Sequence, residues 1–239
     1  MRHGGWLSWL CSFADNALYP VMFVDYLAYL RGDMDPLERW LIAAALISVI
    51  TWLNLRGIRL VQVPTTLLAQ VDSSVGGKVG VNLPAGKNLV GAFHQPRLVL
   101  CDLDTLKTLP PREFRAGLAE VIKYGIIYDE ALFRRLECDL PKLLRKQTTV
   151  LEPVIARCCE IKGGVVGQDE TESGLRAILN FGHTIGHALE AISSYGKYLH
   201  GEAISIGQVA AAQLSSDLLG FPTEHTARVT ELFKRAGLP

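Results

Sequence analysis

The hydrophobic pattern changes character along the chain. Residues 40–55 (WLIAAALISVITWLNL) carry no charge and are bounded by Arg39 and Arg56. Short runs rich in aliphatic and β-branched residues at 58–63 and 97–103 predict strands. Beyond residue 110, apolar residues recur at intervals of three and four, which predicts helices.

The C-terminal half is predicted to be helical throughout. A first helix starts at Pro110-Pro111, and Gly237 with Pro239 forms a stop signal at the other end. The first helix carries its apolar side chains at positions 114, 118, 121 and 122. Further helices are expected at about 129–137, 149–164, 174–193, 201–219 and 223–236. The pattern therefore predicts α/β plus all-α: a small β-containing piece at 58–104 and a helical domain at 105–239, after an apolar, helical segment at 1–57.

The uncharged stretch has two interpretations. Sixteen residues of helix span about 24 Å, which is less than the roughly 30 Å hydrocarbon core of a bilayer. The stretch is either a short membrane span, with residues 37–55 as an anchor, or a buried helix. The apolar stretch upstream, Trp6 to Leu30, lacks the charged start and the small-residue cleavage site expected of a secretory signal.

Composition narrows the function classes. Lysine plus arginine equals aspartate plus glutamate at 24 each, which argues against a nucleic-acid-binding protein. The five cysteines include no CxxC pair and cannot all be paired, which predicts reduced thiols in a cytoplasmic protein.

Two glycine–lysine loops are candidate anion sites. The strings Gly76-Gly77-Lys78 and Gly86-Lys87-Asn88 combine accessible backbone amides with a positive charge. The first is not a Walker loop, because Asp72 and Val79 stand where that motif needs Gly and Ser or Thr. The alternative is a glycine turn with a solvated lysine.

Histidines and carboxylates form a second cluster of candidates. Glu172, Arg176, Asn180, His183 and His187 are spaced by four, four, three and four, which places them on one helical stripe. His183 and His187 resemble the paired ligands of an HExxH zinc site, although Thr184 replaces the glutamate. Glu120 and Lys123 share a helix face, either as a surface ion pair or as part of a site.

Long, ordered motifs carry a family resemblance over about 56–239. RGIRLVQVPTTLLAQVDSSVGGKVGVNLPAGKNLVGAFHQP, TLPPREFRAGLAEVIKYGII, DETESGLRAILNFGHTIGHALE and LHGEAISIG resemble 3-dehydroquinate synthase of the sugar-phosphate cyclase superfamily. The resemblance implies a remnant of an NAD-binding α/β domain followed by a helical metal-binding domain. It also implies the lyase reaction that turns 3-deoxy-D-arabino-heptulosonate 7-phosphate into 3-dehydroquinate and phosphate, in the shikimate pathway of aromatic amino acid biosynthesis.

The resemblance also assigns roles to residues. It implies NAD and one divalent metal, zinc or cobalt, held by Glu120, His183 and His200, so that the i, i+4 histidine pair is not the metal pair. Catalytic roles fall to Asp72, Lys123, Glu172 and His187. Substrate contacts fall to Arg56, Lys78, Lys87, Asn88, Lys162, Arg176 and Asn180. NAD contacts fall to Thr65, Thr66, Asp72, Lys78, Lys87 and Thr108. Arg56 resembles an arginine that reaches a neighbouring subunit, which implies a homodimer.

The N-terminal part departs from the family. Residues 1–55 contain no glycine-rich dinucleotide-binding turn, and about 16–59 resemble part of an APC-type amino-acid permease. The family also continues beyond the last residues of this chain. We therefore expect a truncated or chimeric chain with an intact metal site but poor or absent turnover.

Three other functions stay open at this point. A glycerol dehydrogenase-like metal enzyme fits less well with Lys78 and Lys87, which suit a phosphorylated, carboxylated sugar acid. A different sugar-phosphate cyclase, making an inosose or a valiolone, is the second, and Lys162 and Arg176 argue against the inosose because that substrate lacks a carboxylate. An inactive membrane-associated fragment is the third.

Overall fold

The computed structural model describes residues 35–38, 40–42, 44–45, 48, 60–83, 86–170, 174–193 and 197–239. The described residues between 36 and 48 are helical. Most of segment 1–57, including most of the apolar stretch and the permease-like stretch, lies outside these residues. None of the described helices combines the length and the apolar character needed to cross a bilayer.

The chain divides into two compact units, 1–60 with 77–97 and 61–76 with 98–239. The first unit contains an antiparallel hairpin of β2 (Lys78–Leu83) and β3 (Gly86–Phe93), in which Lys78 pairs with Phe93 and Gly80 with Gly91. The prediction of a loop over 83–88 is thus wrong for residues 86–88, which belong to β3. Leu83 pairs with Gly86, so the connection shrinks to two residues and the glycine–lysine string becomes part of a strand.

The second unit begins with short elements. The parallel strands β1 (Val61–Gln62) and β4 (Leu98–Val99) pair with each other, at the places where strands were predicted but over two residues only. Pro64 follows β1 and has no amide hydrogen to extend the ladder. The short helices η1 (Ala69–Ser73) and η2 (Leu103–Lys107) come next. The Thr66 hydroxyl accepts a hydrogen bond from the Ala69 amide, the first residue of η1, at 3.1 Å.

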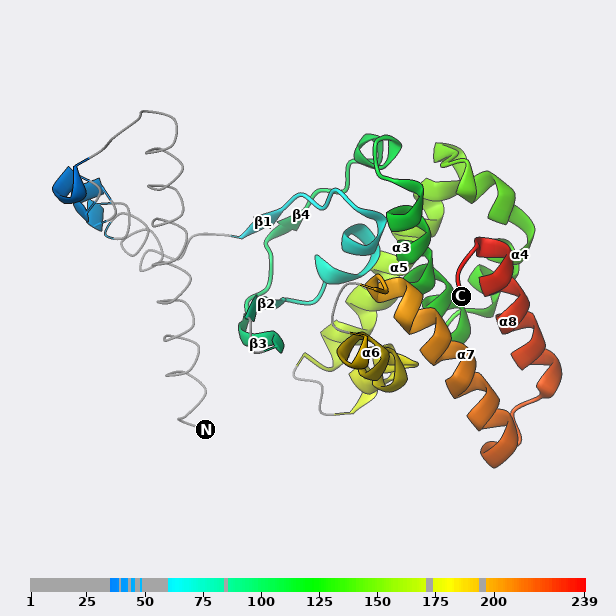
Figure 1. The fold of residues 1–239 in the computed structure, drawn as a ribbon. Helices are drawn as coiled ribbons and strands as arrows, with labels where there is room; N and C mark the ends of the chain where they lie inside the picture. The colour runs from blue at the N-terminus through cyan, green and yellow to red at the C-terminus, as the bar shows by residue number, and fades with distance from the viewer. Residues whose placement is uncertain are drawn as a thin grey trace. The chain divides into compact units, whose positions relative to one another are not determined.

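Helices make up the rest of this unit (Figure 1). They are α3 (Pro111–Ile127), α4 (Glu130–Leu144), α5 (Thr148–Gln168), η3 (Leu175–Asn180), α6 (His183–Ile192), α7 (His200–Leu219) and α8 (Thr223–Ala236). α3 packs against α4, α5, α7 and α8 and is their common neighbour. Its predicted apolar residues Phe114, Leu118, Val121 and Ile122 are all buried. Because every residue from 116 to 125 is buried, the polar side chains of α3 also lie inside the unit.

The prediction of a single helix over 174–193 is wrong. The chain forms the 3₁₀ helix η3, turns at Phe181 and Gly182, and starts α6 at His183. Gly182 adopts a φ of 78°, and a Cβ there would lie 2.5 Å from the backbone nitrogen of Gln208. Both the turn and the close packing therefore require glycine. The five-residue polar stripe does not exist, because Arg176 is buried while Asn180 is exposed.

The cysteines that the structure describes, Cys101, Cys138, Cys158 and Cys159, are free thiols, as predicted. The fold class is α/β followed by all-α, also as predicted. The domain boundaries after residues 57 and 104 remain our proposal.

Candidate metal centre

Glu120 lies at the centre of the candidate site, on the buried helix α3. Its side chain is fully buried. One carboxylate oxygen, Oε2, forms an ion pair with the Lys123 ammonium one turn later. The other, Oε1, accepts no hydrogen bond from the described residues. It lies 3.4 Å from His183 Nε2 and 3.5 Å from His200 Nε2.

The two histidines come from the first residues of α6 and α7. These helices cross closely because Gly207 on α7 packs against the Gly182 carbonyl, where a Cβ would approach to 2.0 Å. α7 is tied to α3 by the hydrogen bond from Gln208 Nε2 to the Ala119 carbonyl, at 3.2 Å. The crossing of three helices therefore brings together residues that are 63 and 17 positions apart in sequence.

One oxygen and two nitrogens form a donor set with the chemistry of a zinc site. The ligand atoms of Glu120, His183 and His200 lie within 4.8 Å of one another. His183 Nδ1 lies 3.2 Å from the Phe181 carbonyl, so the tautomer with hydrogen on Nδ1 leaves Nε2 free to bind a cation. A buried carboxylate oxygen without a donor fits a cation, and three ligands leave the open position that catalytic zinc needs.

Electrostatics keep the carboxylate charged. Burial would favour neutral Glu120, but Lys123 and the two imidazoles hold its pKa well below the usual range. Burial likewise disfavours charged Lys123, yet Glu120 and Asp72 raise its pKa. His200 is only partly buried, and although this burial disfavours its charged form, contact with Glu120 raises its pKa, with help from Glu190 and Asp72. Glu120 is therefore a charged carboxylate surrounded by basic groups, and a carboxylate must be deprotonated in this way to bind a metal ion.

A second ion-pair network adjoins the first. Asp72, in η1, accepts hydrogen bonds through Oδ1 from Lys162 Nζ at 2.7 Å and the Tyr124 hydroxyl at 3.1 Å, and lies 3.9 Å from Lys123 Nζ. Burial would raise the pKa of Asp72, but Lys162 and Lys123 lower it overall. Lys123 thus links the candidate metal ligand Glu120 to Asp72.

Arg176 is buried and donates hydrogen bonds to two backbone carbonyls. Its guanidinium donates to the Glu170 carbonyl at 2.6 Å and to the Gly76 carbonyl at 3.0 Å. These two contacts are the guanidinium hydrogen bonds found among the described residues. The side chain therefore fixes the turn at Gly76, whatever else it binds.

The other predicted site residues are more scattered. His187 is exposed, and its ring centroid lies 5.3 Å from that of His183 and 5.9 Å from that of His200. Asn180 is exposed, Thr65 is exposed, and Thr108 donates to the Thr105 carbonyl. Lys78 is exposed on the hairpin of the other unit. Arg56, Glu172 and the side chains of Lys87 and Asn88 lie outside the described part of the chain.

Two carboxylates near the histidines have roles that sequence reasoning missed. Glu202 accepts from the Leu199 amide at 2.9 Å and pairs twice with Arg112 at 2.7 Å, so it caps the helix that begins with His200. Glu190, buried on α6, lies 3.5 Å from His200 Nδ1. Its spacing of three residues from His187 was the one signal in the sequence that pointed to it.

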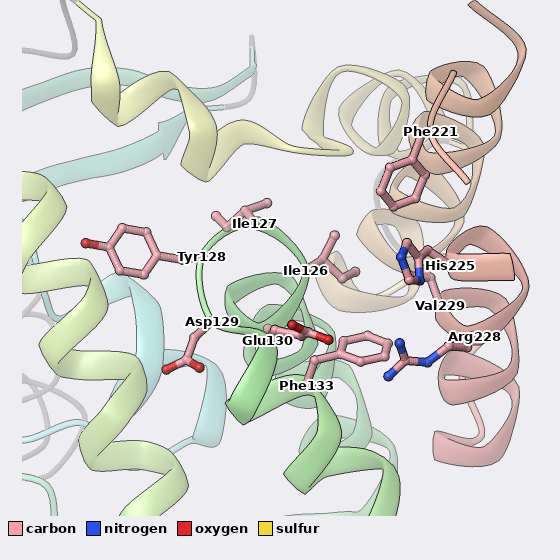
Figure 2. A pocket seen from close by; sticks show the side chains of 11 residues that line it. Ile126, Ile127, Tyr128, Asp129, Glu130, Phe133, Phe221, His225, Arg228 and Val229 are labelled. Carbon is pink, nitrogen blue, oxygen red and sulfur yellow. The ribbon is translucent and has the colours of Figure 1, made fainter. Parts of the chain in front are cut away.

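A separate cavity of about 290 Å³ lies between the α3–α4 turn and α8. Figure 2 shows Ile126, Phe133, Phe221 and His225 around it, while Tyr128 points away. Arg228, at the rim of the cavity, donates two hydrogen bonds to the Glu137 carboxylate, from Nε at 3.0 Å and from Nη2 at 2.6 Å. The cavity shares no residue with the metal cluster.

Comparison with known proteins agrees with this architecture. The family model for the 3-dehydroquinate synthase C-terminal region matches residues 117–239, and the N-terminal one matches 43–116. The match thus starts upstream of the expected residue 56. It overlaps the end of the permease-like stretch, for which the resemblance stays a prediction.

Individual relatives are similar over most of this chain. A 3-dehydroquinate synthase of Nostoc punctiforme is 58% identical over 191 residues, which are 79% of this chain and 52% of that protein. The 2-epi-5-epi-valiolone synthase of Streptomyces hygroscopicus, solved with NAD+ and Zn2+, gives a TM-score of 0.73 at 28% identity, covering 83% of this chain and 55% of that one. A 2-deoxy-scyllo-inosose synthase, solved with carbaglucose-6-phosphate, NAD+ and Co2+, gives a TM-score of 0.66 at 34% identity, covering 82% of this chain and 53% of that one. The chain spans about half the length of the relatives it matches.

Proposed function

Because this chain belongs to the 3-dehydroquinate synthase family, we propose that it carries the metal- and substrate-binding half of that enzyme's site. The reaction is the conversion of 3-deoxy-D-arabino-heptulosonate 7-phosphate to 3-dehydroquinate and phosphate. The observation that supports this most strongly is the buried Glu120 oxygen facing His183 and His200 at 3.4 and 3.5 Å. Glu120, His183 and His200 would hold zinc or cobalt.

The two cofactors supply distinct chemistry when bound: the metal polarises a substrate oxygen, and NAD exchanges a hydride. The chain's own residues bind and orient the substrate. The charged side chains of Lys123 and Asp72 lie beside Glu120 and would form hydrogen bonds with the hydroxyls of a sugar ring. His187, exposed beside His183, would hold or accept a proton next to the phosphate.

Lys162 and Arg176 would recognise the carboxylate. Lys162 donates to Asp72 and Arg176 to two backbone carbonyls, which holds both side chains in place. A guanidinium has five N–H donors in a planar fork, so its contacts with these two carbonyls are compatible with a bidentate carboxylate pair. The predicted contacts from Arg56, Lys78, Lys87, Asn88, Asn180 and Glu172, the NAD contacts from Thr65, Thr66 and Thr108, the homodimer and the cytoplasmic location remain part of this proposal.

Substrate binding to the zinc-loaded chain tests the proposal. By isothermal titration calorimetry, we expect 3-deoxy-D-arabino-heptulosonate 7-phosphate to bind in the presence of zinc and at least tenfold more weakly to His183→Ala. The matched control, His225→Ala, removes an exposed histidine of α8 and leaves binding unchanged. Glucose 6-phosphate, which has the phosphate but no carboxylate, is expected to bind much more weakly.

The same samples decide how complete the site is. In a phosphate-release assay with zinc and NAD, we expect turnover far below that of the Nostoc synthase. Turnover equal to that of the Nostoc enzyme would contradict the expected impairment. Substrate binding that is indifferent to zinc and to His183→Ala would contradict the proposed function itself.

A further inference from the structure

Glu190 is a buried carboxylate that the proposed reaction does not use. It lies in the last turn of α6, and its side chain is 4% exposed. A carboxylate at such depth is costly unless polar or charged groups surround it. Its Oε1 lies 3.5 Å from Nδ1 of His200, which begins α7.

His200 consequently lies between two carboxylates. Its Nε2 faces Glu120 Oε1 at 3.5 Å, and its Nδ1 faces Glu190 Oε1 at the same distance. An imidazole that binds a metal through Nε2 carries its hydrogen on Nδ1, and an acceptor at Nδ1 fixes that tautomer and the ring orientation. In His183 the Phe181 carbonyl occupies the corresponding position.

We propose that Glu190 is a positioning residue, which holds His200 in the Nδ1–H tautomer and so presents Nε2 to the metal. This inference rests on the proposed metal site at Glu120, His183 and His200. The separation of 3.5 Å is long for a hydrogen bond, and contacts of this kind tighten when a site is loaded. The two histidine ligands thus differ in what lies behind them, a carboxylate for His200 and a neutral carbonyl for His183.

A rival role exists for the same residue. His187, Glu190 and His200 also present three ligand atoms within 4.8 Å, as a second metal site would. The orientation of His200 argues against it, because Nε2 is directed at Glu120 and only Nδ1 is left for Glu190. Metal stoichiometry separates the two roles.

The test measures zinc affinity by competition with a chromophoric chelator. We expect Glu190→Gln to weaken zinc binding about 10- to 100-fold, as is typical for partners of metal-bound histidine. The stoichiometry stays at one per chain, and Glu190→Asp recovers part of the loss. Glu152→Gln, an exposed carboxylate of α5, is the matched control and leaves the affinity unchanged.

A second readout is independent of any variant. Long-range ¹⁵N–¹H spectra of histidine-labelled, zinc-loaded protein report which ring nitrogen of His200 carries the hydrogen, and we expect Nδ1. Hydrogen on Nε2 would overturn the proposal even if Glu190→Gln failed to fold. Unchanged affinity in folded Glu190→Gln, or loss of one of two zinc ions, would overturn it while leaving the proposed function intact. A wild-type chain that binds no zinc would instead refute the metal site on which both rest.

Discussion

Gly201 packs so closely on Ala116 that a Cβ at Gly201 would lie 1.8 Å from the Ala116 carbonyl oxygen. Gly201 is the second residue of α7, directly after His200, and Ala116 lies one turn before Glu120 on α3. This contact sets the approach of the two helices at the point where they deliver two candidate ligands. The metal centre thus depends on the absence of a side chain at this position.

Gly201→Ala is expected to destabilise the protein and to weaken the metal site. Forcing a methyl group into this contact moves backbone against backbone, so we expect a loss of at least about 2 kcal/mol. His200 moves with the start of α7, so zinc affinity falls as well. Thermal unfolding and zinc titration measure the two effects.

The control for this change is Gly163→Ala. Gly163 is exposed within α5, and an added Cβ there would meet nothing within 4 Å. Alanine is the better helix former, so we expect a gain of about 0.5–1 kcal/mol. If both variants lost stability to the same extent, the packing argument for Gly201 would fail.

Lys123→Met tests the charge balance of the core. Lys123 is 1% exposed and compensates Glu120 and Asp72, so its loss leaves carboxylates unbalanced in the interior. We expect a destabilisation of about 3–5 kcal/mol in denaturant unfolding, as for other broken buried pairs. Added zinc should restore part of it, because the cation takes over the compensation of Glu120.

Lys142→Met provides the comparison. Lys142 pairs with Asp139 at 2.7 Å, but its side chain is 51% exposed. Screening by water limits the effect of such a pair to about 0–1 kcal/mol. Equal losses in the two variants would show that Lys123 is not a structural counter-charge.

Much of the helical architecture was predictable because its causes are local. The spacing of Phe114, Leu118 and Ile122 predicted the buried face of α3, and the Pro110-Pro111 pair predicted its start. The break at Phe181 and Gly182 was missed, since apolar and polar residues keep a helical period through it. The need for glycine there comes from Gln208 on another helix, a contact that no local pattern contains.

Acid stability should depend on Asp129. This residue caps α4 by accepting from the Leu132 amide at 3.0 Å and pairs with Arg157 at 2.6 Å. The hydrogen bond from Leu132 and the contacts with Arg157 lower its pKa below the ordinary value of about 3.9. A lowered pKa means that this stabilisation is fully present above pH 4 and is lost as the pH falls through the folded-state pKa.

Asp129→Ala is therefore expected to cost about 0.5–2 kcal/mol at pH 7. The difference in the free energy of unfolding between this variant and the wild type should narrow as the pH is lowered below 4. Urea unfolding from pH 7 to pH 3 measures it. Asp129→Asn keeps an acceptor for the Leu132 amide and should lose less. A gap that stays constant or widens toward low pH would contradict the proposed role of the charge.

The candidate site was only partly accessible to sequence reasoning. Spacing alone favours His183 with His187, because i and i+4 lie on one helical face. The geometry instead places His183 with His200, from different helices, around Glu120 on a third. Motif resemblance named these three residues, but the buried pairing of Glu190 with His200 has no local signature beyond its distance from His187.

Zinc stoichiometry tests the central claim most directly. Atomic absorption on purified, zinc-equilibrated protein should find one zinc per chain in the wild type and in His187→Ala. It should find none in His183→Ala and none in Glu120→Gln, while the His225→Ala control retains the metal. Retention of zinc by His183→Ala, or its loss from His187→Ala alone, would contradict a metal centre built from Glu120, His183 and His200.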